Sequence, residues 1–196
     1  LVGFNESHVN KLIQKLKDEG VKFYFSENTK SVKPNAQRFI VETESGKMIE
    51  TDYVLDATGR KPNVEQIGLE KVGIQFSDRG IEVDDYLRTN VKNIYASGDV
   101  INKMIPKLTP TATFESNYIA AHILGLNTDA IQYPPIPSVL YSLPRLSQIG
   151  VTVSEAKKDD TYIIKDIPFG RQMVFEYQNE TEAEMSIVLD SQKHLV

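Results

Sequence analysis

The stretch from Asn93 to Pro110, NIYASGDVINKMIPKLTP, holds the features that decide the fold. Its first residues, NIYAS, indicate a short strand, and the pair Gly98-Asp99 follows that strand directly. Ten residues after Asp99, Thr109-Pro110 opens a predicted helix. Because ligands of open α/β sheets bind outside the carboxyl ends of the strands, this order predicts a ligand site beside Asp99.

Gly98 and Asp99 suit a contact with a polar ligand. Gly98 lets a backbone come close to a ligand because it has no side chain. The carboxylate of Asp99 can accept charge-assisted hydrogen bonds from the hydroxyl groups of a sugar or sugar alcohol, each worth about 1.5–3 kcal/mol. A Gly-Asp pair is also an ordinary turn sequence, so the dipeptide alone leaves both interpretations open.

The helix predicted over residues 110–124 would direct its amino end toward the same site. With Thr109 as the N-cap residue, Pro110 falls at the first helical position, where its missing N–H is not needed. The N–H groups and the positive dipole end of such a terminus stabilise negative charge. Gly125 is placed to end the helix. An ordinary well-capped helix without a ligand is the alternative.

A second candidate site follows a short apolar strand predicted over Asp52–Ala57. The loop after it contains ATGRKPN, whose small residues permit close packing against a ligand. Arg60 or Lys61 could meet a phosphate or a ring there, although a solvated basic loop explains them equally well.

The residues before this loop predict a helix, a strand and a hairpin. Asn5 or Ser7 is placed to cap the helix, and Gly20 is placed to end it. VKFYF over Val21–Phe25 then indicates a buried strand, the second half of a βαβ unit. RFIVET and KMIET flank Ser45-Gly46, which is a hairpin signal.

A proline-rich stretch, QYPPIP over Gln132–Pro137, is the clearest domain boundary in the sequence. Beyond it the spacing predicts an antiparallel sheet, with a short helix near Ser154–Lys158. The predicted strands cover residues 138–142, 146–152, 162–169, 171–177 and 184–190. The expected fold class is therefore α/β before this boundary and α+β after it.

The composition excludes several classes of protein. The chain has 196 residues, 25% of them charged, and a formal net charge of −5, with no basic stripe for a nucleic acid. It contains no cysteine, so neither a disulfide framework nor a thiolate zinc site is available within it. It shows no membrane-length apolar run and no signal peptide. The absence of disulfides and of a signal peptide fits a cytoplasmic protein. The chain opens without Met and ends two residues into an apolar stretch, so we expect an internal segment of a longer protein.

The order of these motifs resembles the FAD-dependent pyridine nucleotide–disulfide oxidoreductases, the family of glutathione reductase, dihydrolipoamide dehydrogenase and mercuric reductase. The resemblance is carried by TDYVLDATGRKPN, then TNVKNIYASGDV, then LTPTA, in that order along the chain. It continues in IGLEKVGIQ between the first two motifs and in PPIPSVLYSLPRLSQIGVTVSEA after the third. The resemblance thus covers essentially all 196 residues.

The resemblance implies FAD and NAD(P)H as cofactors and gives roles to nine residues. By it Asp99, beside Gly98, binds the ribityl chain of FAD, and Leu108, Thr109 and Pro110 begin the helix that faces the flavin pyrimidine. The remaining residues match the family's crossover near FAD (Thr58 and Gly59), the NAD(P)H side (Arg60) and the strand that reaches the nicotinamide pocket (Leu140).

The resemblance also implies three partial domains and a function. Residues 1–57 match the second half of the NAD(P)-binding domain, residues 58–131 the closing segment of the FAD domain, and residues 132–196 an incomplete dimerisation domain. The family passes hydride from NAD(P)H through FAD to a cysteine pair, assisted by a His–Glu pair of the partner subunit. We therefore expect a segment of a homodimeric disulfide reductase, glutathione reductase-like.

The segment alone should bind FAD weakly or not at all and should not oxidise NAD(P)H, because the glycine-rich phosphate loops and the cysteine pair of the family are not in it. We assign no catalytic residue and no metal ligand within it, and NAD and NADP stay undecided. The alternatives are a related flavoprotein whose acceptor is mercuric ion, a quinone or oxygen, and a non-catalytic dimerisation module.

Overall fold

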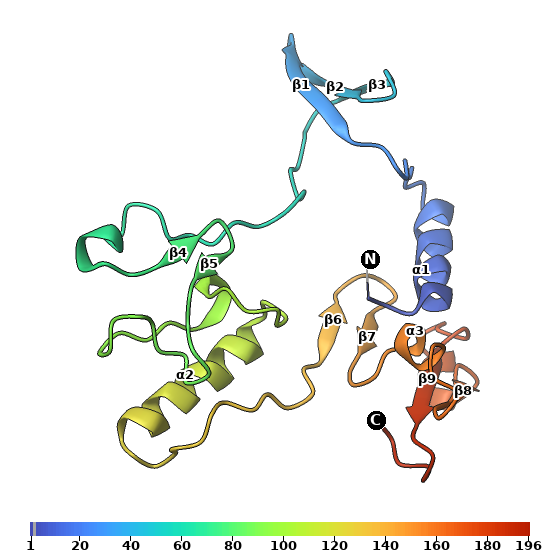
Figure 1. Ribbon diagram of the computed structural model, residues 1–196. Coiled ribbons are helices and arrows are strands. Elements are labelled where there is room, and N and C mark those ends of the chain that lie inside the picture. The colour runs from blue at the N-terminus through green and yellow to red at the C-terminus, as the bar shows by residue number, and fades with distance from the viewer. Residues whose placement is uncertain (2) are drawn as a thin grey trace. The chain divides into compact units, whose positions relative to one another are not determined.

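The computed structural model describes residue 1 and residues 3–196 (Figure 1). The chain forms two compact units, one of residues Ile13–Arg60 and one of Leu1–Leu12 together with Lys61–Val196. No helix in the described part of the chain is long and apolar enough to cross a membrane.

The first helix, α1 (Glu6–Asp18), is confirmed with the ends that the sequence predicts. Asn5 caps it, since its Oδ1 accepts a hydrogen bond of 3.1 Å from the backbone N–H of Ser7. Gly20 ends it with a φ of 93°, a left-handed conformation that glycine adopts without steric cost.

The unit of residues 13–60 is built on a three-stranded antiparallel sheet in the order β1-β2-β3. Its strands are β1 (Thr29–Asn35), β2 (Arg38–Thr43) and β3 (Met48–Thr51). The predicted hairpin of β2 and β3 is confirmed, with Gly46 at a φ of 86° in the turn. The sequence gives no strand signal for β1 because it contains Pro34, a residue that sheets accept on an edge strand such as this one.

Two predicted strands of this unit, Val21–Phe25 and Asp52–Ala57, are wrong. Both segments are extended or turn-like, and no other strand in the described part of the chain pairs with either. Tyr53 and Leu55 are 88% and 90% exposed, so the apolar run is not buried here. A strand is stable only beside a hydrogen-bonding neighbour, and an apolar pattern does not supply one.

The middle of the other unit contains short elements before one long helix. These are the 3-10 turns η1 (Glu70–Val72) and η2 (Gly98–Val100), strands β4 (Phe76–Ser77) and β5 (Gly80–Ile81), and helix α2 (Thr109–Ile123). The core has two clusters of buried residues, one of Val64, Leu69, Ile74 and Ile81 and one of Leu87, Ile101, Tyr118 and Ile131.

The strand predicted for NIYAS is reduced to one antiparallel bridge between Arg88 and Tyr95, and this prediction is wrong for a regular strand. The neighbouring residues Ile81 and Ile101 form a parallel bridge. Backbone bonds from Thr89 N to Ile94 O and from Ala96 N to Leu87 O accompany the Arg88–Tyr95 bridge, but turns begin on either side, so no regular strand forms. Gly98 and Asp99 still follow this segment, as the sequence predicts, but from a 3-10 turn.

The residues after Pro137 form two antiparallel hairpins and two short helices. The hairpins are β6 (Ser138–Leu140) with β7 (Leu146–Gln148) and β8 (Ile163–Pro168) with β9 (Glu184–Leu189). The predicted short helix is confirmed as α3 (Val153–Ala156), which Thr152 and Glu155 close with reciprocal capping bonds.

The strand predicted over residues 171–177 is wrong, because Met173–Glu176 forms the short helix α4. The ring of Phe175 packs against Phe169 with a centroid distance of 4.9 Å, and Tyr177 closes a helical backbone bond of 3.0 Å to Met173. These local hydrogen bonds and this aromatic pair favour the helix over the strand that the apolar run indicates. The predicted mixture of helix and sheet is nevertheless confirmed for the chain as a whole.

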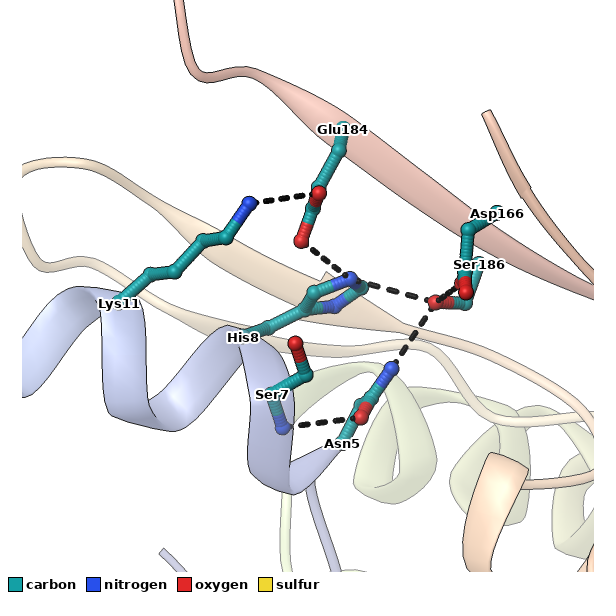
Figure 2. A network of polar contacts seen from close by, with 7 residues as sticks. All are labelled: Asn5, Ser7, His8, Lys11, Asp166, Glu184 and Ser186. Atoms are coloured by element: carbon teal, nitrogen blue, oxygen red, sulfur yellow. Dashed lines mark hydrogen bonds and ion pairs between the residues drawn. The ribbon is translucent and has the colours of Figure 1, made fainter. Parts of the chain in front are cut away.

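Side chains from the start of α1 meet β8 and β9 in a polar network that the sequence does not predict (Figure 2). The Nδ2 of Asn5 donates to Ser186 Oγ at 2.9 Å, and Ser186 donates in turn to Asp166 at 2.5 Å. Lys11 Nζ and His8 Nε2 lie 2.6 Å and 3.3 Å from the two carboxylate oxygens of Glu184. This network joins residues about 180 positions apart.

Candidate functional site

A shallow hollow lies where η2 meets the amino end of α2. Gly98, Asp99 and Leu108, three of the residues predicted to form the site, line it. The other lining residues are Ile105, Pro106, Lys107, Thr111 and Glu115. Asp99 is exposed, so its carboxylate is accessible to a ligand. The structure thus gathers Gly98, Asp99 and Leu108 at one place, while the predicted site residues Thr109 and Pro110 do not line the hollow.

Position 98 favours glycine for a conformational and a steric reason. Its φ of 76° is left-handed, and a Cβ added there would lie 3.1 Å from the Cβ of Ala112 in α2. The backbone N–H of Gly98 donates a hydrogen bond of 2.5 Å to Glu115 Oε2, also in α2. The turn that carries Asp99 is therefore held close against the helix.

The helix α2 begins one residue earlier than the sequence predicts. Leu108 is the N-cap residue, with an extended backbone and no side-chain capping bond, and its carbonyl accepts from Ala112 N at 3.0 Å. Thr109 and Pro110 are the first two helical residues, so the prediction of Thr109 as the cap is wrong. The geometry suits proline as well, because the first N–H groups of a helix have no intrahelical acceptor.

Thr111 lines the hollow with a buried hydroxyl group. The residue is 5% exposed, and its Oγ1 has no hydrogen-bond partner in the described part of the chain. A buried hydroxyl without a partner costs about 1–3 kcal/mol, so such a group is uncommon unless something else bonds to it. Sequence analysis missed Thr111 because a threonine in the first turn of a helix is ordinary.

Glu115 and Tyr133 form a buried pair beside the hollow that sequence analysis also missed. Glu115 is 1% exposed, and its Oε1 accepts a bond of 2.7 Å from the Tyr133 hydroxyl. Burial, and then the bond to Glu115, raise the pKa of Tyr133 well above its ordinary value, so the phenol stays a donor. The sequence indicates this pair only by its spacing. Thr111, Glu115 and Tyr118 stand at i, i+4 and i+7, so Glu115 shares one helix face with the other two.

Hydrogen bonds within the segment between Asp99 and Leu108, and from it to β5, hold this segment in place. The ammonium group of Lys107 donates to the backbone carbonyl of Ile101, which is 1% exposed. Asn102 N also donates to Ile81 O of β5 at 2.8 Å. These bonds fix the rim of the hollow.

Thr58, Gly59 and Arg60 lie in the unit of residues 13–60 and are exposed. The N–H and Oγ1 of Thr58 donate to Asp56 Oδ1 at 3.0 Å and 2.7 Å, which forms a tight turn. The side-chain bond, followed by the backbone bond, lowers the pKa of Asp56 below its ordinary value. Leu140 lies in β6, paired with Leu146, and is not part of the hollow.

Replacing Thr58 by Val should raise the pKa of Asp56 toward its ordinary value of about 3.9, because the stronger of its two donors is removed. A carboxyl group whose pKa is lowered by folding stabilises the folded state at pH values above its ordinary pKa. This stabilisation is lost as the pH falls through the folded-state pKa. The stability difference between the two proteins should therefore disappear in strong acid. An NMR titration of the Asp56 carboxyl carbon measures the shift.

Asp159 is the matched control for this titration. Its pKa is lowered by bonds from Thr161, in a turn of the same kind in the other unit. The Thr58→Val substitution should leave the Asp159 titration unchanged. An unchanged Asp56 titration would contradict the assigned cause.

The chain is similar in sequence to several known proteins. The model of the family "Pyridine nucleotide-disulphide oxidoreductase" matches residues 1–116. Dihydrolipoyl dehydrogenase from Bacillus subtilis is 35% identical over 202 residues, which cover 100% of this chain and 42% of that protein. Trypanothione reductase from Trypanosoma congolense is 33% identical over 161 residues, covering 81% of this chain and 32% of that enzyme.

The fold is similar to those of two solved proteins. The HOCl-induced flavoprotein disulfide reductase RclA from Escherichia coli superposes with a TM-score of 0.89 at 20% identity, over 98% of this chain and 45% of that one. LpdA from Mycobacterium tuberculosis gives a TM-score of 0.85 at 22% identity, over 95% and 40% of the two chains. The chain spans about two fifths of the length of its first curated relatives. Because the family model matches more than half of its residues, the chain belongs to the pyridine nucleotide-disulphide oxidoreductase family.

Proposed function

We propose that this chain is the flavin- and nicotinamide-facing part of an FAD- and NAD(P)H-dependent disulfide reductase, glutathione reductase-like in its reaction. The observation that carries the proposal is the hollow at which the exposed carboxylate of Asp99 meets the amino end of α2. Family membership and the relatives whose names state a disulfide substrate or a flavoprotein support it.

The residues of the hollow fit FAD on chemical grounds. The carboxylate of Asp99 would hold the hydroxyl groups of the ribityl chain by charge-assisted hydrogen bonds. The hydroxyl of Thr111, buried and without a partner in the described part of the chain, would gain one from a polar edge of the ring system. The amino end of α2, with no side-chain cap, would stabilise negative charge on that edge.

FAD bound at this site would supply the chemistry of hydride acceptance from NAD(P)H and electron transfer to a further acceptor. Thr58 and Gly59 would allow the backbone close to the cofactor, since both are exposed and a Cβ at Gly59 would meet nothing within 4 Å. Arg60 would lie on the NAD(P)H side and Leu140 near the nicotinamide. The chain has no cysteine, so sulfur atoms for the disulfide chemistry would come from another part of the protein.

Asp99→Ala in the full-length gene product should raise the Kd for FAD by about 10- to 150-fold. The loss of one charge-assisted hydrogen bond is worth about 1.5–3 kcal/mol, and about 1.4 kcal/mol is a factor of ten. Kd is measured by returning FAD to the apoprotein and following the change in flavin fluorescence. Unchanged FAD affinity would sink the assignment of Asp99.

Two variants control for charge and for folding. Asp99→Asn keeps the shape of the side chain and removes its charge, so its Kd should fall between those of the wild type and Asp99→Ala. Asp78→Ala removes another exposed carboxylate, in the turn between β4 and β5, and should leave FAD affinity unchanged.

We further propose that the protein works as a cytoplasmic homodimer assembled through the residues after Pro137. Large apolar side chains are exposed there, among them Tyr141 at 82% and Leu143 at 74%. Exposed apolar surface of this kind is what association buries, and closed dimers are the commonest assembly.

The electron acceptor is tested by NAD(P)H oxidation with the flavin-loaded protein. Turnover with a low-molecular-weight disulfide supports a disulfide reductase. Turnover with mercuric ion, a quinone or oxygen alone would identify a related flavoprotein. No flavin binding and no turnover, with a stable dimer, would leave a dimerisation module.

A further inference from the structure

We infer that Glu115 is a positioning residue for the flavin site, whose buried carboxylate fixes the turn that presents Asp99. The inference rests on the proposed role of Asp99 in holding FAD. Glu115 itself is 1% exposed and accepts the N–H of Gly98, so it acts through the backbone of Gly98.

Both carboxylate oxygens of Glu115 have a donor. Oε2 accepts the N–H of Gly98 at 2.5 Å, and Oε1 accepts the hydroxyl of Tyr133 at 2.7 Å. Burial of a carboxylate is costly unless strong hydrogen bonds offset it, and short bonds to a carboxylate are among the strong ones. An apolar residue at position 115 would fill the same space without that cost, so the two bonds are the reason for the acid.

The bond to Gly98 sets the orientation of the next residue. Gly98 has a φ of 76°, and a Cβ at its Cα would lie 3.1 Å from Ala112 Cβ. Ala112 and Glu115 are neighbours on one face of α2, at i and i+3. The turn therefore lies close to α2 and is bonded to it by the Gly98 N–H and by the hydroxyl pair of Ser97 and Ser116 at 3.3 Å, and Asp99 is the residue that follows.

The same helix supplies the other wall of the hollow. Leu108 and Thr111 belong to the first turn of α2, and Glu115 lies one turn further along. By holding the Asp99 turn to α2, Glu115 fixes the carboxylate relative to the helix terminus. A ligand that uses both needs that relation to be rigid.

Tyr133 fixes Glu115 from the opposite side. It belongs to the segment after α2, and its ring packs against Phe114 with a centroid distance of 5.8 Å. Its raised pKa keeps the hydroxyl protonated, so it donates to the carboxylate over the whole physiological range. Tyr133, Glu115 and Gly98 thus form a chain of contacts that ends at Asp99.

The test uses the full-length gene product and two readouts, the Kd for FAD and the hydrogen exchange of the Gly98 amide in the flavin-free protein. Glu115→Ala should raise the Kd about tenfold or more, the effect of about 1.4 kcal/mol, and should accelerate exchange at Gly98. Glu115→Gln should restore most of the affinity, because its amide oxygen can accept from Gly98 and its amide nitrogen can donate to the Tyr133 oxygen. Tyr133→Phe removes one donor only and should give an intermediate Kd.

The double variant Asp99→Ala/Glu115→Ala separates positioning from general stability. If Glu115 acts through Asp99, its substitution should add little to the Kd once Asp99 is gone. Val188→Ala in β9, 4% exposed, is the destabilised control, and its Kd below the melting range should equal that of the wild type.

Each outcome bears on one claim. Additive losses in the double variant, or a Glu115→Ala protein with normal Kd and normal Gly98 exchange, would overturn the positioning role while the function of Asp99 stands. Normal affinity of Asp99→Ala alone would overturn the proposed site and this inference with it. If Glu115→Ala does not fold, Tyr133→Phe and Glu115→Gln test the positioning role instead. A Tyr133→Phe protein with normal exchange at Gly98 and an unchanged Kd for FAD counts against the inference.

Discussion

Gly80→Ala should lower the free energy of unfolding by about 2–5 kcal/mol. A Cβ on Gly80 would lie 2.3 Å from the carbonyl oxygen of Val100 and 2.9 Å from the carbonyl carbon of Ile101. These are backbone atoms, so the contact cannot be relieved by a side-chain rotation. The overpacking term is about 1–3 kcal/mol, and the φ of 123° adds about 1–2 kcal/mol for any residue with a Cβ.

Gly46→Ala is the matched control for this substitution. Gly46 also has a positive φ, 86°, but a Cβ there would meet nothing within 4 Å. This variant should therefore lose only the conformational term of about 1–2 kcal/mol. Urea unfolding followed by tyrosine fluorescence compares the two, and equal losses would show that the contact with Val100 carries no cost.

The second large effect concerns Leu87, which is fully buried although its backbone φ is 58°. Leu87→Ala should lower the free energy of unfolding by about 2–5 kcal/mol, because it empties a site in the cluster with Ile101 and Tyr118. Leu87→Gly should be no less stable than Leu87→Ala, although glycine is normally the worse of the two. Glycine adopts this φ without the roughly 1–2 kcal/mol that a Cβ costs.

Ile101 provides the control for this reversal. It is 1% exposed in the same cluster, but its φ of −85° suits any residue. At this position the Gly variant should be less stable than the Ala variant by about 0.5–1 kcal/mol. Denaturant unfolding of the four variants is the measurement, and a Leu87→Gly protein clearly below Leu87→Ala would disprove the argument from backbone conformation.

The surrounding turn explains why the chain accepts this conformation at Leu87. The Oδ1 of Asp84 accepts the N–H groups of Tyr86 and Arg88, each at 2.9 Å. The carbonyl of Leu87 accepts from Ala96 N at 3.1 Å, just before η2. Burial of the side chain and these bonds together offset the backbone cost.

Local signals in the sequence predicted the elements that they control. Helix α1 was predictable because Asn5 and Gly20 act on residues within a few positions of them. The β2–β3 hairpin was predictable because Ser45-Gly46 makes the turn. The family resemblance, confirmed by the comparisons, came from the order of motifs around Asp99.

Contacts between distant residues were beyond a reading of the sequence. The apolar runs at Val21–Phe25 and Asp52–Ala57 could be recognised, but not the lack of a pairing strand for them in the described part of the chain. In the site, Gly98, Asp99 and Leu108 were predicted together. Glu115 was missed because its bonds run to Gly98 and Tyr133, which lie 17 and 18 residues away.

The network between α1 and β9 has a consequence for the order of events while the protein is being made. Asn5 and Ser186 are 181 residues apart, and translation adds about 5–20 residues per second, so α1 precedes its partner by about 9–36 s. During that interval His8 and Lys11 have no contact with Glu184. The sheet β1-β2-β3 needs only neighbouring residues and can form at once. A nascent chain arrested before β9 should therefore contain that folded sheet while Asn5, His8 and Lys11 still lack their partners in β9.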